Sequence, residues 1–159
     1  MYKMYQLGKT SKQRLSTCHV DLQLIMNESI KVSTVDFGIA QGERSIEQQQ
    51  EYFDNGKSKI NPKKYSSLIE LFKRAKHLVD GVIRKKSDAV DVYAYYNGSA
   101  QWDIESLCYI AGVVTATADR LLKEKKISHK IRWGGNWDQD GVILIDQSFI
   151  DGPHYELVR

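Results

Sequence analysis

Two short segments place acidic and histidine residues inside otherwise apolar strands. They are SDAVDVYAYYNG at 87–98, which contains Asp91, and DGPHYELV at 151–158, which contains Asp151 and His154. A carboxylate such as Asp91 is costly to bury among alanine, valine and tyrosine side chains unless a positive charge or a metal meets it. The imidazole of His154, at the start of the last strand, could bind the same metal. The residue types therefore indicate a candidate metal site shared by the two segments.

Catalytic zinc usually has three protein ligands and keeps a fourth position for water, so Asp91 and His154 need a third partner. The chain contains four histidines from which to choose. Asp151 lies three residues before His154 across Gly152 and Pro153, a suitable place for a general base that is not itself a ligand. On the residues alone a second interpretation stays open, in which Asp91 is a solvated or salt-bridged strand residue, Asp151 lies in a turn and His154 is an ordinary strand-end histidine.

Hydrophobic periodicity predicts the elements that must position these residues. Apolar residues at helical spacing predict helices, and alternating runs bounded by turn residues predict strands. The predicted helices span 11–32, 45–56, 62–81 and 103–126, and the predicted strands span 35–40, 88–95, 131–133, 142–145 and 154–158. This pattern predicts an α+β fold in which helices pack on a small, mainly antiparallel central sheet, and the candidate zinc site would lie on that sheet. We expect a single domain over 1–159, because no repeat and no linker rich in Pro, Gly or Ser interrupts the chain.

Three further polar residues are placed by these elements. His19 lies at the edge of the apolar stripe of the first helix, and we interpret it as a packed helix histidine. Arg44 lies between a strand and the helix capped by Ser45, a junction held rigidly on both sides, which suits a site residue. If the helix at 62–81 continues through His77, that side chain lies about 180° from the apolar face and points to solvent.

The composition limits the classes of function. With 42% hydrophobic and 27% charged residues the chain is globular, and no apolar run approaches the roughly 18 residues of a membrane-spanning helix. The N-terminal stretch lacks the apolar middle of a secretory signal, so we expect synthesis in the cytoplasm. The net charge of +3 is modest, and no stretch combines dense Lys and Arg with aromatics as nucleic-acid-binding surfaces do. Cys18 and Cys108 indicate no disulfide framework, and we interpret both as small buried hydrophobes.

Five sequence blocks, in order along the chain, resemble one family of zinc peptidases. They are LGKTSKQRL near the start, DFGIAQGERSIEQQQEYFDNGKSK at 36–59, DAVDVYAYYNGSAQWD at 88–103, IRWGGNWDQDG at 131–141 and DGPHYEL at 151–157. In these blocks the chain resembles phage endolysins with L-alanyl-D-glutamate endopeptidase activity and the related D,D-carboxypeptidases of vancomycin resistance. The resemblance implies a zinc-dependent hydrolase for an amide bond in the stem peptide of peptidoglycan. The L-Ala to D-Glu bond is favoured because Asp151 matches the phage enzymes, whereas the carboxypeptidases usually have Glu.

The resemblance also implies roles for residues that match the family's motifs. The aspartate of the A-x-D element and the histidine of the final D-G-x-H element are zinc ligands, which fall on Asp91 and His154. The acidic residue three before that histidine is the catalytic base, here Asp151. The arginine of Q-G-x-R-[ST] binds the substrate and helps to stabilise the tetrahedral transition state, here Arg44. The remaining zinc ligand is expected at His77, fourteen positions before Asp91.

His77 departs from the family pattern S-x-H-x-x-G-x-A-x-D, in which the histidine lies closer to the aspartate and is accompanied by serine and glycine. An insertion between His77 and Ser87 would reconcile the two. A ligand other than histidine stays an alternative, as do a D-Ala-D-Ala carboxypeptidase and a non-catalytic relative that binds the wall. We expect a monomer whose partner is the stem peptide, with no nucleic acid and no membrane insertion, acting on the cell wall after release.

Overall fold

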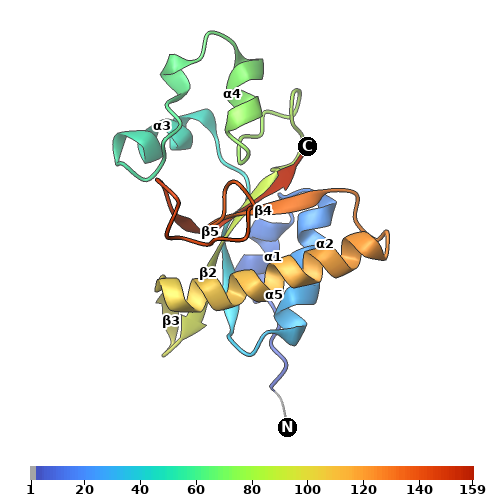
Figure 1. The fold of residues 1–159 in the computed structure, drawn as a ribbon. Coiled ribbons are helices and arrows are strands. Elements are labelled where there is room, and N and C mark those ends of the chain that lie inside the picture. The colour runs from blue at the N-terminus through green and yellow to red at the C-terminus, as the bar shows by residue number, and fades with distance from the viewer. Residues whose placement is uncertain (1–2) are drawn as a thin grey trace.

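The computed structural model describes residues 3–159 and has helices packed on a small sheet (Figure 1). The helices are α1 (Lys9–Leu15), α2 (Val20–Val32), α3 (Ile46–Asp54), α4 (Leu68–Arg74) and α5 (Ile104–Lys123), with a 3₁₀ turn, η1 (Pro62–Lys64). The strands are β1 (Phe37–Gln41), β2 (Ala89–Tyr96), β3 (Ser99–Gln101), β4 (Lys130–Gly134) and β5 (Asp151–Val158). The predicted α+β class, in a single domain, is confirmed.

The sheet has the order β1-β2-β5-β4, with β3 paired to β2 and every neighbouring pair antiparallel. The register sets Asp91 of β2 opposite His154 of β5 on one side and opposite Gln41 of β1 on the other. Because side chains alternate along a strand, Val90 and its partner Tyr155 point to the other face. One face of the sheet therefore carries the polar residues, and the other is buried in the core.

Helices α1, α2 and α5 cover the apolar face of the sheet (Figure 1). Helix α5 is capped by Asp103, whose carboxylate accepts the backbone N–H of Ser106. Its buried side chains include Val114 and Leu121, which share one core with Leu22 of α2. This core is the rigid base on which the opposite face of β2 and β5 is presented.

Helices α3 and α4 lie on the other side of the sheet (Figure 1). The predicted capping box of α3 is present, because Ser45 Oγ accepts the N–H of Gln48 while the Gln48 side chain accepts the N–H of Ser45. A small second core, built on Leu71, Phe72 and Leu78, holds α4 in place. These elements form a wall that faces the polar side of the sheet.

The single helix predicted over 11–32 is wrong, because α1 and α2 are separate. The hydroxyls of Ser16 and Thr17 donate to carbonyls of the last turn of α1, which competes with continuation of the helix. His19 is the N-cap of α2, and its Nδ1 accepts the backbone N–H of Asp21. The interpretation of His19 as a histidine packed within a helix is therefore also wrong.

The helix predicted over 62–81 is wrong as well, because α4 is much shorter. It begins after Ser67, whose side chain accepts the N–H of Glu70, and ends before Ala75, which has an extended backbone. His77 follows in a hydrogen-bonded turn, in which the N–H of Leu78 donates to the carbonyl of Ala75, and it is only 4% exposed. The expected solvent-facing position of His77 on a helix therefore does not exist.

The strand predicted over 142–145 is also absent, since this segment turns instead. Gln139 and Leu144 both have positive φ angles, 61° and 67°, which break the pleat of a strand. Conversely, β3 was not predicted, although Asn97 and Gly98 (φ 53° and 75°) form a tight turn into it. That Asn-Gly dipeptide is a recognisable hairpin signal.

The expectations from composition have mixed outcomes. Within residues 3–159 no helix is long and apolar enough to cross a membrane. Cys18 is buried as expected, whereas Cys108 is only half-buried, and both are free thiols.

Candidate active site

Side chains of His77, Asp91 and His154 meet at one point on the polar face of the sheet. His77 Nε2 lies 3.1 Å from Asp91 Oδ1 and 3.2 Å from His154 Nδ1, and the His154 Nδ1 to Asp91 Oδ1 distance is 3.1 Å. Ligands bound tetrahedrally to zinc at 2.0–2.1 Å lie about 3.3 Å from one another. The three atoms thus form nearly the triangle that three of four tetrahedral ligands would form.

The outer hydrogen bonds of the two imidazoles fix which nitrogens face this point. His77 Nδ1 lies 2.6 Å from the carbonyl oxygen of Gly42, and His154 Nε2 lies 3.0 Å from Glu156 Oε2. Both partners only accept, so each of these nitrogens carries the proton, and in a neutral ring the other nitrogen holds a lone pair. Two lone pairs and the Asp91 carboxylate then converge with no proton among them. Such a donor set fits a metal cation, and imidazoles fixed from behind are typical of metal sites.

Without a metal, a proton takes the place of the cation. Burial lowers the pKa of His154, but the hydrogen bonds that its ring donates to Asp91 and Glu156 outweigh burial and raise the pKa to about 10. Burial raises the pKa of Asp91, but the charges of His77 and His154 outweigh it and hold the pKa well below its usual value. A metal must therefore displace a proton from this site.

Glu156 supports His154 from the same face of β5, two residues further along the strand. Its carboxylate also accepts from Arg132 Nη2 on the neighbouring strand β4. Burial raises the pKa of Glu156, but the hydrogen bonds from His154 and Arg132 dominate and lower it to about 2. The group that orients His154 is therefore an ionised carboxylate.

Arg44 reaches the site from the junction between β1 and α3, where rigid elements hold it as predicted. Its Nη1 donates to Gln49 Oε1 at 2.8 Å, and its Nη2 donates to Gln41 Oε1 at 2.9 Å. The Nη2 atom also lies 3.5 Å from Asp91 Oδ2, and the guanidinium stacks 4.2 Å above the ring centre of Tyr52. The side chain is 7% exposed, so a fixed positive charge is held close to the candidate metal ligands.

Asp151, at the start of β5, lines the same cleft as the three donors. Burial and the charge of Asp91 raise its pKa, and they outweigh His154, His77 and Arg44, which lower it. A carboxyl group whose pKa is shifted towards neutrality can both take up and return a proton. This is the property that a general base at this place requires.

The donors lie in a cleft of roughly 1410 Å³ between the sheet and the wall formed by α3 and α4. This is larger than the roughly 300–1,000 Å³ typical of small-molecule pockets, and it suits an extended polymer. Trp137 lines the cleft, with its ring centre 5.5 Å from that of His154. Trp133 instead belongs to the core and donates to the carbonyl of Gly152.

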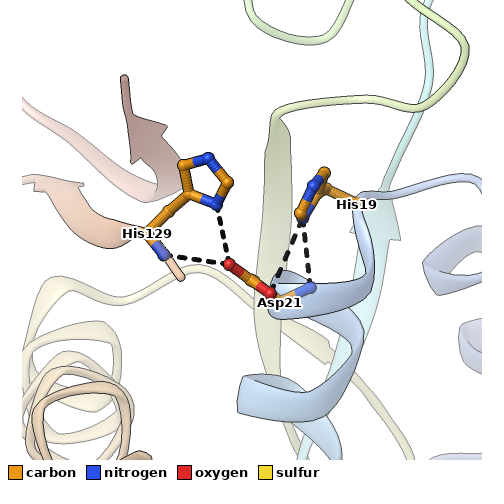
Figure 2. Close-up of side chains that lie close together, drawn as sticks. All are labelled: His19, Asp21 and His129. Carbon is orange, nitrogen blue, oxygen red and sulfur yellow. Dashed lines mark hydrogen bonds and ion pairs between the residues drawn. The ribbon is translucent and has the colours of Figure 1, made fainter. Parts of the chain in front are cut away.

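A second group of the same residue types lies between α2 and β4, where His19 and His129 flank Asp21 (Figure 2). Asp21 Oδ2 accepts from the backbone N–H groups of Ser128 and His129 and from His129 Nδ1, at 2.8–3.0 Å. Burial raises the pKa of Asp21, but these hydrogen bonds outweigh it and lower the pKa. The residue types of both groups are compatible with a metal, but Asp21 is already satisfied as a structural acceptor.

Comparison with known proteins places the chain in a family. A family model described as phage L-alanyl-D-glutamate peptidase matches residues 3–158. The chain belongs to this family. It is 28% identical over 157 residues to the L-alanyl-D-glutamate peptidase of Escherichia phage T5, covering 97% of this chain and 98% of that protein. The crystal structure of the L-Ala D-Glu endopeptidase ChiX of Serratia marcescens shares the fold, with a TM-score of 0.67, 24% identity, and coverage of 98% of this chain and 92% of that one.

The structure brings together all five residues singled out in the sequence. They are His77, Asp91, His154, Asp151 and Arg44. Sequence reasoning missed the groups that hold them, which are the Gly42 carbonyl, the glutamines around the arginine, and Glu156 with its arginine partner. Glu156 alone had a readable signal, because a residue two positions after a strand histidine faces the same side.

Proposed function

We propose that residues 1–159 form one zinc-dependent peptidase domain that hydrolyses the L-Ala to D-Glu bond in the stem peptide of peptidoglycan. The observation that carries the proposal is the triangle of lone-pair donors in a large cleft. Membership in the phage L-alanyl-D-glutamate peptidase family supports the choice of bond. As an endolysin the protein would act on the cell wall after release from the host cytoplasm.

In this proposal His77, Asp91 and His154 hold the zinc. Bound zinc would act as a Lewis acid that polarises the scissile carbonyl, and it would lower the pKa of the attacking water to roughly 7. The Gly42 carbonyl and Glu156 keep the two imidazoles in the tautomers that binding requires.

Asp151 and Arg44 perform the other two tasks of amide hydrolysis. Asp151 takes the proton of the attacking water and returns it to the leaving amine, for which its raised pKa is suited. Arg44, fixed by two glutamines and an aromatic ring, supplies positive charge to the oxyanion that develops on the scissile carbonyl. Because its neighbours hold it before substrate arrives, it needs no rearrangement during the reaction.

The products of wall digestion test the proposal. Purified peptidoglycan is incubated with zinc-loaded protein and with the Asp151→Asn variant as a matched control, and the new peptide termini are identified by mass spectrometry. We expect N-terminal D-glutamate with the parent protein and little product with the variant. Release of free D-alanine would instead show a carboxypeptidase, and no product from zinc-loaded protein would indicate a non-catalytic relative.

A further inference from the structure

The cleft contains an excess of positive charge that the proposed reaction does not use. Within residues 3–159, the acidic side chains that line it are Asp91, Asp151 and Glu156, and each already has a place in the site. Lysine and arginine side chains outnumber them around the cleft. An unbalanced set of cations in a confined space concentrates anions there.

Lys76 is one of these cations, and it interacts electrostatically with Glu156, the carboxylate that supports His154. It precedes His77, is half-buried and lines the cleft. Its backbone carbonyl accepts the N–H of Asp88 at 2.9 Å, which fixes this segment to the start of β2. In the part of the chain that the structure describes, its ammonium group has neither a hydrogen-bond acceptor nor an ion-pair partner, although Glu156, Asp88, Arg84 and Arg132 act on it electrostatically.

Both carboxylates near Lys76 are already satisfied by other groups. Glu156 accepts from His154 and from Arg132. Asp88 forms an ion pair with Arg84 at 3.2 Å and accepts hydrogen bonds from two nitrogens of Arg159 at 2.7 and 2.8 Å. Neither carboxylate is free to neutralise Lys76.

Arg132 is a second cation on the same side of the site, and it also lines the cleft. Its guanidinium lies 5.3 Å from the ring centre of Trp137, and its Nη1 donates to the carbonyl of that residue. These contacts hold the side chain in place, and because it is 35% exposed, part of it still faces the cleft. Lys76 and Arg132 therefore both line the cleft around Glu156, the carboxylate that holds His154, and only Arg132 is paired with it.

A substrate with an L-Ala to D-Glu bond brings a matching anion. The glutamate continues the stem peptide through its γ-carboxyl group, so its α-carboxylate is free and lies two bonds from the scissile nitrogen. We propose that Lys76 and Arg132 form a subsite that binds this α-carboxylate on the leaving-group side of the scissile bond. The inference rests on the proposed function and deepens it, because it makes the free acid, rather than its amide, the preferred substrate.

Two synthetic stem peptides that differ at one group test the subsite. One carries the free α-carboxylate on the D-glutamate and the other carries an α-carboxamide, and kcat and KM are measured for both with zinc-loaded protein. The variants are Lys76→Met, which removes the charge at similar size, and Lys76→Arg, which restores it. Lys85→Met serves as the matched control, because Lys85 is exposed and does not line the cleft.

We expect the parent to favour the acid over the amide by about tenfold in kcat/KM, as one charge-assisted contact predicts. Lys76→Met should lose most of this preference, mainly through a higher KM for the acid, while Lys76→Arg and Lys85→Met keep it. Binding of the acid to the inactive Asp151→Asn variant, measured by calorimetry, should weaken similarly when Lys76→Met is added. Equal rates for acid and amide with the parent would overturn the subsite and leave the proposed function standing. An equal loss of kcat/KM on both substrates in Lys76→Met would also overturn the subsite. If the parent cleaved neither substrate, the proposed function would be overturned and the subsite with it.

Discussion

Asp21 should stabilise the fold in a pH-dependent way, and Asp21→Asn measures how much. The side chain is 6% exposed, and its Oδ2 accepts three hydrogen bonds, two from backbone N–H groups and one from His129 (Figure 2). The asparagine keeps the shape and one acceptor oxygen but loses the negative charge.

The magnitude follows from the difference between charged and neutral acceptors. A hydrogen bond to a charged group contributes about 1.5–3 kcal/mol and a neutral one about 0.5–1.5 kcal/mol, so three bonds together lose about 3–4.5 kcal/mol of unfolding free energy at pH 7. The pKa of Asp21 is lowered in the folded state, so its contribution is complete above the unfolded value of about 3.9. It is then lost as the pH falls through the folded pKa. The difference between parent and variant should therefore persist from pH 7 to 5 and shrink below pH 4.

Urea unfolding at pH 7, 5 and 3 measures this difference, with Asp119→Asn as a control at an exposed helical aspartate. The control should change the unfolding free energy by less than about 0.5 kcal/mol at every pH. A loss in Asp21→Asn that stayed the same at pH 3 would refute the assignment of the effect to the ionised carboxylate. A loss that appeared only when zinc was added would show that this group is a metal site instead of a structural one.

Three further predictions concern the candidate active site. Asp151→Asn should keep the zinc affinity of the parent within about twofold but lose about 10²–10⁴-fold in kcat, because general-base catalysis contributes that much. Hydrolysis of peptidoglycan by this variant at the parental rate would rule out a general-base role for Asp151. Removal of zinc by a chelator should lower the Tm by about 5–10 °C, compared with protein in free zinc at 100 times the Kd. Equal Tm values for the two samples in scanning calorimetry would contradict a tight zinc site. The apparent zinc affinity should rise about tenfold per pH unit from pH 7 to 9, because a proton must leave His154, whose pKa is raised to about 10. Competition with a chromogenic chelator measures this affinity, and an affinity that did not change with pH would show that no proton is displaced.

The polar face of the sheet could be predicted because strand periodicity is a local property. Asp91 and His154 interrupt apolar strands, and the structure pairs them across β2 and β5. The same alternation places Glu156 beside His154, so its supporting position was readable from the sequence although it was not predicted. Periodicity does not show which strands are neighbours. The family resemblance supported the expectation that the segments 87–98 and 151–158 share one site.

The position of His77 could not be predicted from periodicity, because the apolar pattern does not stop where α4 stops. Leu78 continues the pattern, but it packs in the second core from an extended segment. A local signal was nevertheless present, since Ser67 followed three residues later by Glu70 is a helix-start pattern, and it places the helix later than Pro62.

The break between α1 and α2 was hidden for a related reason. Leu15, Cys18 and Leu22 all enter one core, so burial is continuous although the helix is not. The break depends on Thr17 and on Ser87, a residue far along the chain whose carbonyl accepts the N–H of His19. Contacts of this kind are tertiary and leave no pattern in the local sequence.

The zinc content of single-histidine variants, measured by native mass spectrometry, tests the central claim most directly. The parent should carry one tightly bound zinc, and His77→Ala should carry none, because two remaining protein ligands hold the metal poorly. His129→Ala should keep one zinc, since it alters only the structural group around Asp21. Full zinc content in His77→Ala, or loss of zinc in His129→Ala, would contradict the assignment of His77, Asp91 and His154 as the metal centre.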